Sequence, residues 1–249
     1  MNRSRCLSVA GLVMLAVPAA YAQAPSGSAQ RPVPAAWSQI YHVSFVQAAP
    51  GKIVELEKMM TTPAPGATSP AHVLFLRHRE GSPWDFVTIE HIGATATVET
   101  GWPGPARELR AWHDDTFVAG PPWDVFAKAM GIDSRSGEGA AEPVYVVSTY
   151  RGAAGHRAQL DDTLEKVQAS ASQPGRGVVL RHVEGGAWDS LVLQRYDSWR
   201  DFAADMSDAT AEQRERRAGL TQPAGLALRE HAGSHSDSIA VRVAVPTAR

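Results

Sequence analysis

The sequence predicts an α+β protein built from two tandem copies of one β-α-β-β-α-β unit. The stretch RHREGSPWD at 77–85 returns as RHVEGGAWD at 181–189, with six of its nine positions identical. At the same offset of 104 residues, IYHVSFVQAAPGK from 40 aligns with VYVVSTYRGAAGH from 144. A repeat of about 100 residues is too long for a solenoid, so it indicates a duplicated domain.

The first copy is predicted to contain strands and helices in a defined order. Residues 41–46 alternate and are rich in β-forming residues, which predicts a strand, and Ile53, Leu56 and Met60 then recur at helical spacing. Two β-rich runs on either side of the turn at 80–83 predict a hairpin. The remaining predicted elements are a helix over PARELRAW (105–112), a weaker strand over HDDTFVAG (113–120) and a helix over PPWDVFAKAM (121–130).

The second copy follows the same order. Leu160, Leu164 and Val167 recur at helical spacing, and the next hairpin has the strands GVVLRHV (177–183) and WDSLVLQRY (188–196). Two helical segments and a closing strand complete it: SWRDFAADM (198–206), AEQRERRAGL (211–220) and SHSDSIAVRVAV (234–245). A shorter echo, R-E-x4-H-x-D, begins at Arg107 and again at Arg229, so the second copy carries extra residues before its last strand.

This element order is that of a ferredoxin-like unit, whose antiparallel sheet carries its helices on one face and leaves the other face to be buried. With this order and duplication, the chain resembles a tandem (fused) member of the dimeric α/β-barrel superfamily, in a NIPSNAP-like or another exported branch. The resemblance covers nearly all of residues 38–245. It implies two ferredoxin-like βαββαβ units packed sheet to sheet as a pseudo-symmetric α/β barrel. The expected divisions are a first unit at 38–131, a linker at 132–143 and a second unit at 144–249.

The N-terminal residues are predicted to be a secretory signal. Residues 1–22 have a basic start, an apolar run over 7–20 and small residues at the cleavage site, and residues 23–37 are expected to be a disordered leader. Cleavage would remove Cys6, the single cysteine, and would change the net charge from −2 to −4 because two arginines leave with it. We therefore expect a periplasmic or secreted protein with no disulfide, no nucleic-acid partner and no stable membrane span. We expect either a monomer containing an intramolecular pseudo-dimer or a homodimer.

The repeated stretch contains the first candidate site residues. Arg77-His78 and Arg181-His182 end the second strand of each copy, and neighbouring residues of a strand point to opposite faces. One basic residue per half would then point between the sheets and could bind an anion or polarise a carbonyl. The alternative is that these residues bond to Glu80 or Asp85, and to their counterparts, and close the hairpin. Trp84, Asp85 and Gly81 are predicted to be structural.

Two His-x-Asp pairs form the second candidate set. His113-x-Asp115 and His235-x-Asp237 would each share one face of an extended segment. A carboxylate beside an imidazole fixes its tautomer and raises its basicity, which suits a general base or a metal ligand. The alternative is a helix-to-strand junction at which Asp, Ser and Thr cap backbone groups.

His42, His72 and His91 have no histidine counterpart in the second copy, so we expect any single site to lie in the first. Of these, His42 and His91 are the candidates for lining a ligand pocket, together with Arg181, His182, His235 and Asp237. The histidine spacings match no standard ligand pattern, so no metal ligand and no cofactor are assigned, and a metal site stays open as an alternative.

Three functions remain open. The first is an exported enzyme for a small organic molecule, with His78 or His113 as acid or base, Asp115 beside His113, and Arg77 stabilising developing negative charge. The second is a non-catalytic ligand-binding or stress-linked periplasmic protein of the same fold. The third is haem binding, for which the chain shows no motif. Dinucleotide, phosphate-loop and nucleophile-elbow signatures are absent from the sequence.

Overall fold

The computed structural model of the protein describes residues 39–62, 72–94, 109–132, 142–169, 175–207, 213, 216, 219–220 and 222–244. The predicted signal peptide and leader, most of the predicted linker and most of the predicted helix at 211–220 lie outside these residues. No helix in the described part of the chain has the length and apolar character that a bilayer span requires.

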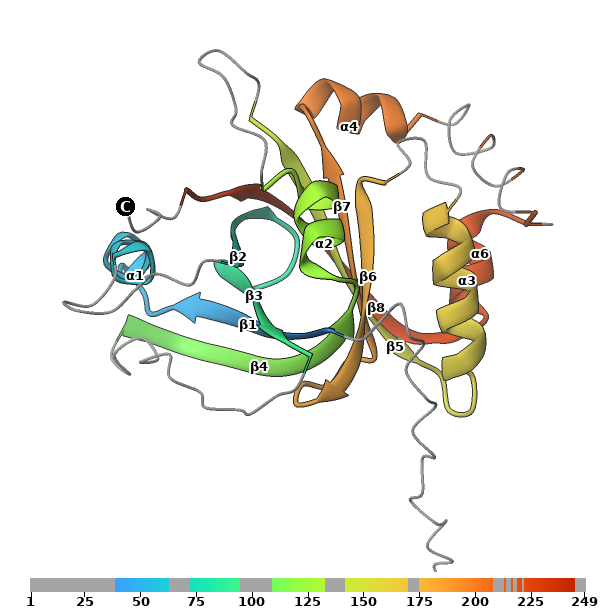
Figure 1. The fold of residues 1–249 in the computed structure, drawn as a ribbon, viewed down its shortest axis with the longest axis horizontal. Coiled ribbons are helices and arrows are strands. Elements are labelled where there is room, and N and C mark those ends of the chain that lie inside the picture. The colour runs from blue at the N-terminus through green and yellow to red at the C-terminus, as the bar shows by residue number, and fades with distance from the viewer. Residues whose placement is uncertain are drawn as a thin grey trace, which may run out of the picture. The chain divides into compact units, whose positions relative to one another are not determined.

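Each half of the chain contributes four strands (Figure 1). The elements of the first half are β1 (Gln39–Ala48), α1 (Ile53–Thr61), β2 (Val73–Glu80), β3 (Phe86–Gly93), β4 (Arg110–Gly120) and α2 (Trp123–Met130). Those of the second half are β5 (Val144–Gly152), α3 (Arg157–Ala169), β6 (Gly177–Glu184), β7 (Ser190–Tyr196), α4 (Trp199–Asp205), α6 (Ala224–Arg229) and β8 (Ala232–Arg242).

One predicted element is wrong over part of its length. We expected a helix over 105–112, but β4 begins at Arg110, and residues 105–108 lie outside the described chain. Trp112 pairs with Gln47 of β1, and Arg110 pairs with Ala48. The ladder to a neighbouring strand therefore decides the conformation here, although Glu, Leu, Arg and Ala are all good helix formers.

The eight strands close into one antiparallel barrel in the order β1-β3-β2-β8-β5-β7-β6-β4. Each half supplies four consecutive strands in the ferredoxin-like order, and the two sheets join edge to edge where β2 pairs with β8 and β4 pairs with β6. The predicted fold class is confirmed. Because all neighbours are antiparallel, β1, β2, β5 and β6 run in one direction, so equivalent residues of the two halves lie at the same end of the barrel.

The helix α2, which follows β4, closes the end of the barrel at which β1 and β5 begin. Side chains of α2, including Phe126 and Met130, belong to the same buried cluster as Tyr41 of β1 and Tyr145 of β5. The Tyr41 hydroxyl donates to the carbonyl oxygen of Pro121 at 2.6 Å, and the Tyr145 hydroxyl donates to that of Met130 at 2.9 Å. The barrel thus has a floor made by α2, and the strand ends opposite it form the other end.

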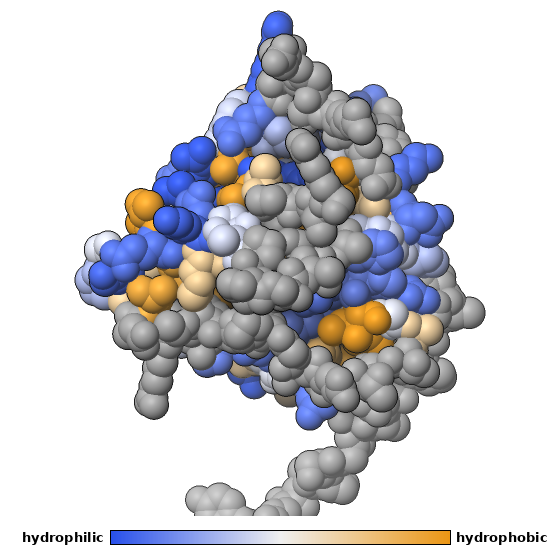
Figure 2. All heavy atoms as spheres, turned by 60° about the vertical axis from the view of Figure 1, so that its left-hand side comes forward, coloured by the Kyte–Doolittle hydropathy of each residue, from blue (hydrophilic) through white to orange (hydrophobic). Residues whose placement is uncertain are grey.

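Helices also cover the outside of the barrel. Leu56 and Met60 of α1 pack on Val46, Phe75 and Phe86 of the first sheet. In the second half α3 and α6 lie side by side (Figure 1). On the face shown in Figure 2, apolar residues form separate small groups among hydrophilic ones. The exposed large apolar residues are Val54, Ile92, Trp112, Val125, Trp199, Met206 and Leu226.

Candidate functional site

The repeated Glu-Gly turn lies where the two halves of the barrel meet. Gly81 and Gly185 both have φ of +116°. A Cβ atom at Gly185 would overlap the carbonyl oxygen of Asp115 and lie 2.8 Å from the Cα of Thr116, both on β4 of the first half. The Gly81 turn makes the equivalent close approach to β8. Only glycine combines this backbone conformation with this proximity, so the repeated glycine is structural.

The aspartate that follows the turn is also structural. The Asp85 carboxylate accepts the backbone N–H of Ala48 at 2.7 Å, and the Asp189 carboxylate accepts that of Gly152 at 2.8 Å. Each aspartate therefore ties the start of its hairpin strand to the end of the first strand of its unit. This structural role is sufficient to explain why both copies have the aspartate.

Of the repeated basic residues, His78 and His182 are the ones that point into the barrel. His78 follows Leu74 and Leu76 on the inner face of β2, and both histidines lie near the strand ends opposite the α2 floor. The ring centroid of His78 lies 5.0 Å from that of Trp84, and the His182 centroid lies 6.2 Å from that of Trp188. The barrel interior, near the end opposite α2, thus carries two imidazoles related by the internal repeat.

Aromatic rings surround these imidazoles. Phe45 of β1 lies between the two tryptophans, with ring centroids 5.4 Å from Trp84 and 6.3 Å from Trp188. Both tryptophans are buried. Offset and edge-on aromatic contacts of this kind favour a further planar ring as a neighbour.

Three polar atoms in this apolar interior have no hydrogen-bond partner in the described part of the chain. They are Nε2 of His78, Nε2 of His182 and Nε1 of Trp188, and all three are buried. A buried donor or acceptor without a partner costs about 1–3 kcal/mol, so folded proteins seldom keep one without a reason. An indole N–H can only donate, whereas a neutral imidazole can donate or accept. The barrel interior is therefore the candidate site.

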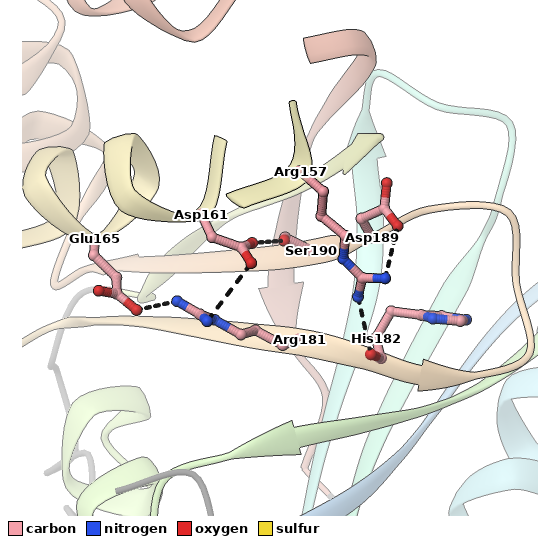
Figure 3. A network of polar contacts seen from close by, with 7 residues as sticks. All are labelled: Arg157, Asp161, Glu165, Arg181, His182, Asp189 and Ser190. Carbon is pink, nitrogen blue, oxygen red and sulfur yellow. Dashed lines mark hydrogen bonds and ion pairs between the residues drawn. The ribbon is translucent and has the colours of Figure 1, made fainter. Parts of the chain in front are cut away.

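The arginines of the repeat lie on the other face of the sheet. Arg77 binds Glu57 of α1 at 2.9 Å, so it does not share a site with His78. Figure 3 shows Arg181 reaching toward α3, where it pairs with Asp161 at 3.6 Å and with Glu165, whereas the ring of His182 lies apart from that helix. The predicted anion site between the sheets is not formed by these arginines, because alternation along the strand directs them outward.

The polar network of Figure 3 holds α3 on the second sheet. Ser190 donates to Asp161 at 3.0 Å, and the side chain of Asp161 is only 8% exposed. Arg157 donates to the carbonyl oxygen of His182 at 3.2 Å and pairs with Asp189 at 3.4 Å. The network thereby fixes the backbone that carries the His182 ring.

Three predicted residues meet on the outside of the first sheet. Nε2 of His42 lies 3.4 Å from one carboxylate oxygen of Asp115, and Nε2 of His113 lies 3.3 Å from the other. The hydrogen bond from His42 is the main cause that lowers the pKa of Asp115, and Ser44 and His113 add to it. This cluster faces away from His78, so the predicted residues divide between two locations.

The equivalent position in the second half is less polar. His235 lies 3.7 Å from Asp237, but Val146 stands where the first half has His42. Asp237 pairs with Ser148 in the ladder as Asp115 pairs with Ser44, which confirms the shorter sequence echo. Asp237 also borders a groove of about 440 Å³ on the outside of the second sheet, whose apolar lining includes Val146, Val167, Phe202, Met206 and Ile239.

Sequence reasoning missed Glu90, which pairs with His42 across the β1–β3 ladder. Burial raises the pKa of Glu90, and the nearby His42 partly opposes that shift. A carboxylate in the middle of a β-rich strand was the available signal. Elsewhere, His91 lies near the α2 floor, with its ring centroid 5.1 Å from that of Tyr41. Burial, with a smaller contribution from His72, lowers the pKa of His91.

Comparison with a solved structure supports the fold. A solved structure of an anthrone oxidase-like protein superposes with a TM-score of 0.53 and 14% identity, covering 83% of this chain and 92% of that one. A monooxygenase candidate from Lactobacillus acidophilus NCFM superposes with a TM-score of 0.48 and 8% identity, covering 84% and 96%. No family model and no curated protein matches the sequence. The fold is a closed antiparallel α+β barrel made of two ferredoxin-like halves in one chain.

Proposed function

We propose that the protein binds a small aromatic molecule with a hydroxyl or carbonyl group inside the barrel, and that His78 and His182 exchange protons with it. The observation that carries this proposal is the set of three buried polar atoms without described partners among aromatic rings. Ligand sites are mostly apolar with a few polar groups that fix orientation, and this interior has that composition.

The chemistry available to these residues is acid–base chemistry. Imidazole is the side chain best suited to proton transfer near neutral pH, and the Nε2 atoms of His78 and His182 both face the interior. The Trp188 N–H is a donor that would stabilise an oxygen on which negative charge develops. One imidazole would remove a proton, while the indole and the other imidazole would hold the oxygen.

We propose an anthrone-type ketone as the substrate class, because the barrel resembles that of an anthrone oxidase-like protein. His78 would take a proton from the CH2 group opposite the carbonyl, which leaves a carbanion whose charge reaches the carbonyl oxygen. Dioxygen is the oxidant. The CH2 carbon loses two hydrogens and gains one oxygen atom as a second ketone, and the other oxygen atom leaves as water.

Non-catalytic binding of the same ligand class is the alternative function. The observation that favours it is the symmetry of the site, since both halves keep a histidine beside a tryptophan. One reacting centre needs only one such set.

We also propose, from residues 1–22 alone, that the protein is exported to the periplasm or secreted. N-terminal sequencing of the protein recovered from its host would test this.

The test uses anthrone as the probe, with quenching of tryptophan fluorescence for binding and oxygen consumption for turnover. We expect His78→Phe to abolish both, and His78→Gln to retain binding and lose turnover, since an amide is not a base. His113→Gln, on the outer face, is the matched control and should change neither. Binding without turnover would favour the non-catalytic alternative. The proposal is overturned if His78→Phe together with His182→Phe leaves anthrone affinity unchanged, or if anthrone does not bind.

A further inference from the structure

We propose that His72 and His91 form a binding site for one divalent transition-metal ion, with Cu²⁺ bound most tightly. His72 precedes β2, His91 lies on β3, and the backbone N–H of His91 donates to the His72 carbonyl oxygen at 2.9 Å. Their Nδ1 atoms are 3.2 Å apart. This pair lies at the α2 end of the barrel, away from His78 and His182, so the inference does not depend on the proposed function.

The hydrogen bond on the other side of His91 determines which nitrogen is free to bind. Nε2 of His91 lies 2.8 Å from Oε1 of Gln39. An amide oxygen can only accept, so Nε2 of a neutral His91 carries the hydrogen and its Nδ1 presents a lone pair to His72. Without metal, His72 donates its Nδ1 hydrogen to that lone pair. When His72 carries its hydrogen on Nε2 instead, both Nδ1 lone pairs are available to one ion.

The separation of the two nitrogens suits a shared metal ion. Two imidazole nitrogens at about 2.0–2.1 Å from one ion lie about 2.9 Å apart at a right angle and about 3.4 Å apart at the tetrahedral angle. The observed 3.2 Å lies between these limits. No third His, Cys, Asp or Glu joins the pair in the described residues, so water would complete the coordination. Two imidazoles with water suit Cu²⁺, which also stands highest in the general order of affinities.

Neighbouring side chains hold both rings in place. Trp123, the first residue of α2, stacks on His72 with ring centroids 4.6 Å apart and an interplanar angle of 15°. It also stacks on His91 at 5.7 Å and 23°. Gln39 supplies the outer hydrogen bond that metal-binding histidines usually have. These contacts restrict the movement of both rings, which would have to turn slightly for both Nδ1 lone pairs to meet at one ion.

The fold itself does not require this pair. In the internal repeat His72 aligns with Arg176 and His91 with Arg195, and both arginines pair with Asp197 in the second half. At this place a salt-bridge cluster joins the strands in the second half, and two imidazoles join them in the first. The difference gives the first half a chelating pair that the second half lacks at the equivalent position.

The chain also contains a matched control pair. His156 and His231 have their Nδ1 atoms 3.4 Å apart and their rings stacked at 20°. As in the His72–His91 pair, one residue is exposed and the other is half-buried. The described residues supply neither an outer amide partner nor a stacked tryptophan for that pair. It therefore measures how much metal affinity two adjacent histidines provide by proximity alone.

The experiment is a titration of the full chain with CuSO4 and with NiCl2, followed by calorimetry, Trp123 fluorescence and the electron paramagnetic resonance spectrum of Cu²⁺. We expect one tight Cu²⁺ with two nitrogen ligands, tighter than Ni²⁺. The tight site should be lost in His72→Gln and in His91→Gln, and unchanged in His156→Gln. Gln39→Leu should weaken binding about tenfold. Trp123→Phe should keep the ion but remove most of the quenching.

Unfolding of each variant without metal confirms that it folds. Tight Cu²⁺ binding that persists in His72→Gln, or equal losses in His72→Gln and His156→Gln, would overturn the proposal. So would the absence of any Cu²⁺ binding by the folded wild-type chain, since the pair would then be only a hydrogen bond between two imidazoles.

Discussion

Replacing Gly185 with alanine tests whether the repeated turn holds the two halves of the barrel together. Gly185 lies in the β6–β7 turn with φ of +116°, directly against the backbone of β4. The added methyl group would meet the carbonyl oxygen of Asp115 and the Cα of Thr116, and neither can move without shifting the strand. The change therefore acts on the β4–β6 seam.

The expected loss of unfolding free energy has two parts. A non-glycine residue at positive φ costs about 1–2 kcal/mol. Forcing one extra methyl group into a packed contact costs about 1–3 kcal/mol, so the expected total is about 2–5 kcal/mol. Domains are stable by only about 5–15 kcal/mol, so the variant should remain folded but be markedly less stable.

The control is Gly155→Ala, at φ of +80°, because no atom lies within 4 Å of the added methyl group there. It should lose only the backbone part, about 1–2 kcal/mol. The measurement is urea unfolding of both variants and the wild type. Their free energies of unfolding are compared with one common slope of free energy against urea concentration. Gly81→Ala, at the other seam, should resemble Gly185→Ala. Equal losses in Gly185→Ala and Gly155→Ala would refute the reasoning.

Three further predictions follow from the charged and titratable groups. Arg181→Met should lower the free energy of unfolding in urea by about 3–5 kcal/mol, because it leaves the buried Asp161 without the arginine it pairs with. Arg77→Met, at a half-exposed ion pair, should lower it by about 1 kcal/mol or less. Equal losses in the two variants would contradict this. Glu90→Gln should be more stable than wild type near neutral pH. Burial raises the pKa of Glu90. The stability that its carboxyl group contributes is therefore present below pH 4.5 and is lost as pH rises through the pKa of the folded state. Parallel curves of stability against pH for the wild type and Glu90→Gln would count against this prediction. Burial raises the pKa of Tyr150 to about 12, so the ultraviolet titration of wild type minus Tyr150→Phe should have its midpoint near there rather than near 10.

The local pattern of the chain was sufficient for most of the fold. Alternation along residues 73–80 placed Arg77 and His78 on opposite faces, and the structure has them so. The internal repeat predicted two equivalent units, and the strand order confirms them. It also predicted structural roles for Gly81 and Asp85, which the close approach to β8 and the bond to Ala48 explain.

The division of the predicted residues between the barrel interior and its outer face could not be predicted, because contacts between strands depend on sheet order and register. His42 and Asp115 are far apart in sequence and meet only because β1 pairs with β4, while His113 joins them from the same strand as Asp115. Sequence spacing could not show that this cluster faces outward while His78 faces the interior.

The α+β class and the face of each repeated side chain could be predicted from periodicity within single strands, and the duplication from the internal repeat. The folded chain was needed to show that the two sheets join edge to edge through β2–β8 and β4–β6, and that α2 closes one end. It was also needed to show that residues 110–112 extend β4. The reason is physical: ladder hydrogen bonds and buried apolar contacts between distant segments outweigh the weaker preferences of any short stretch.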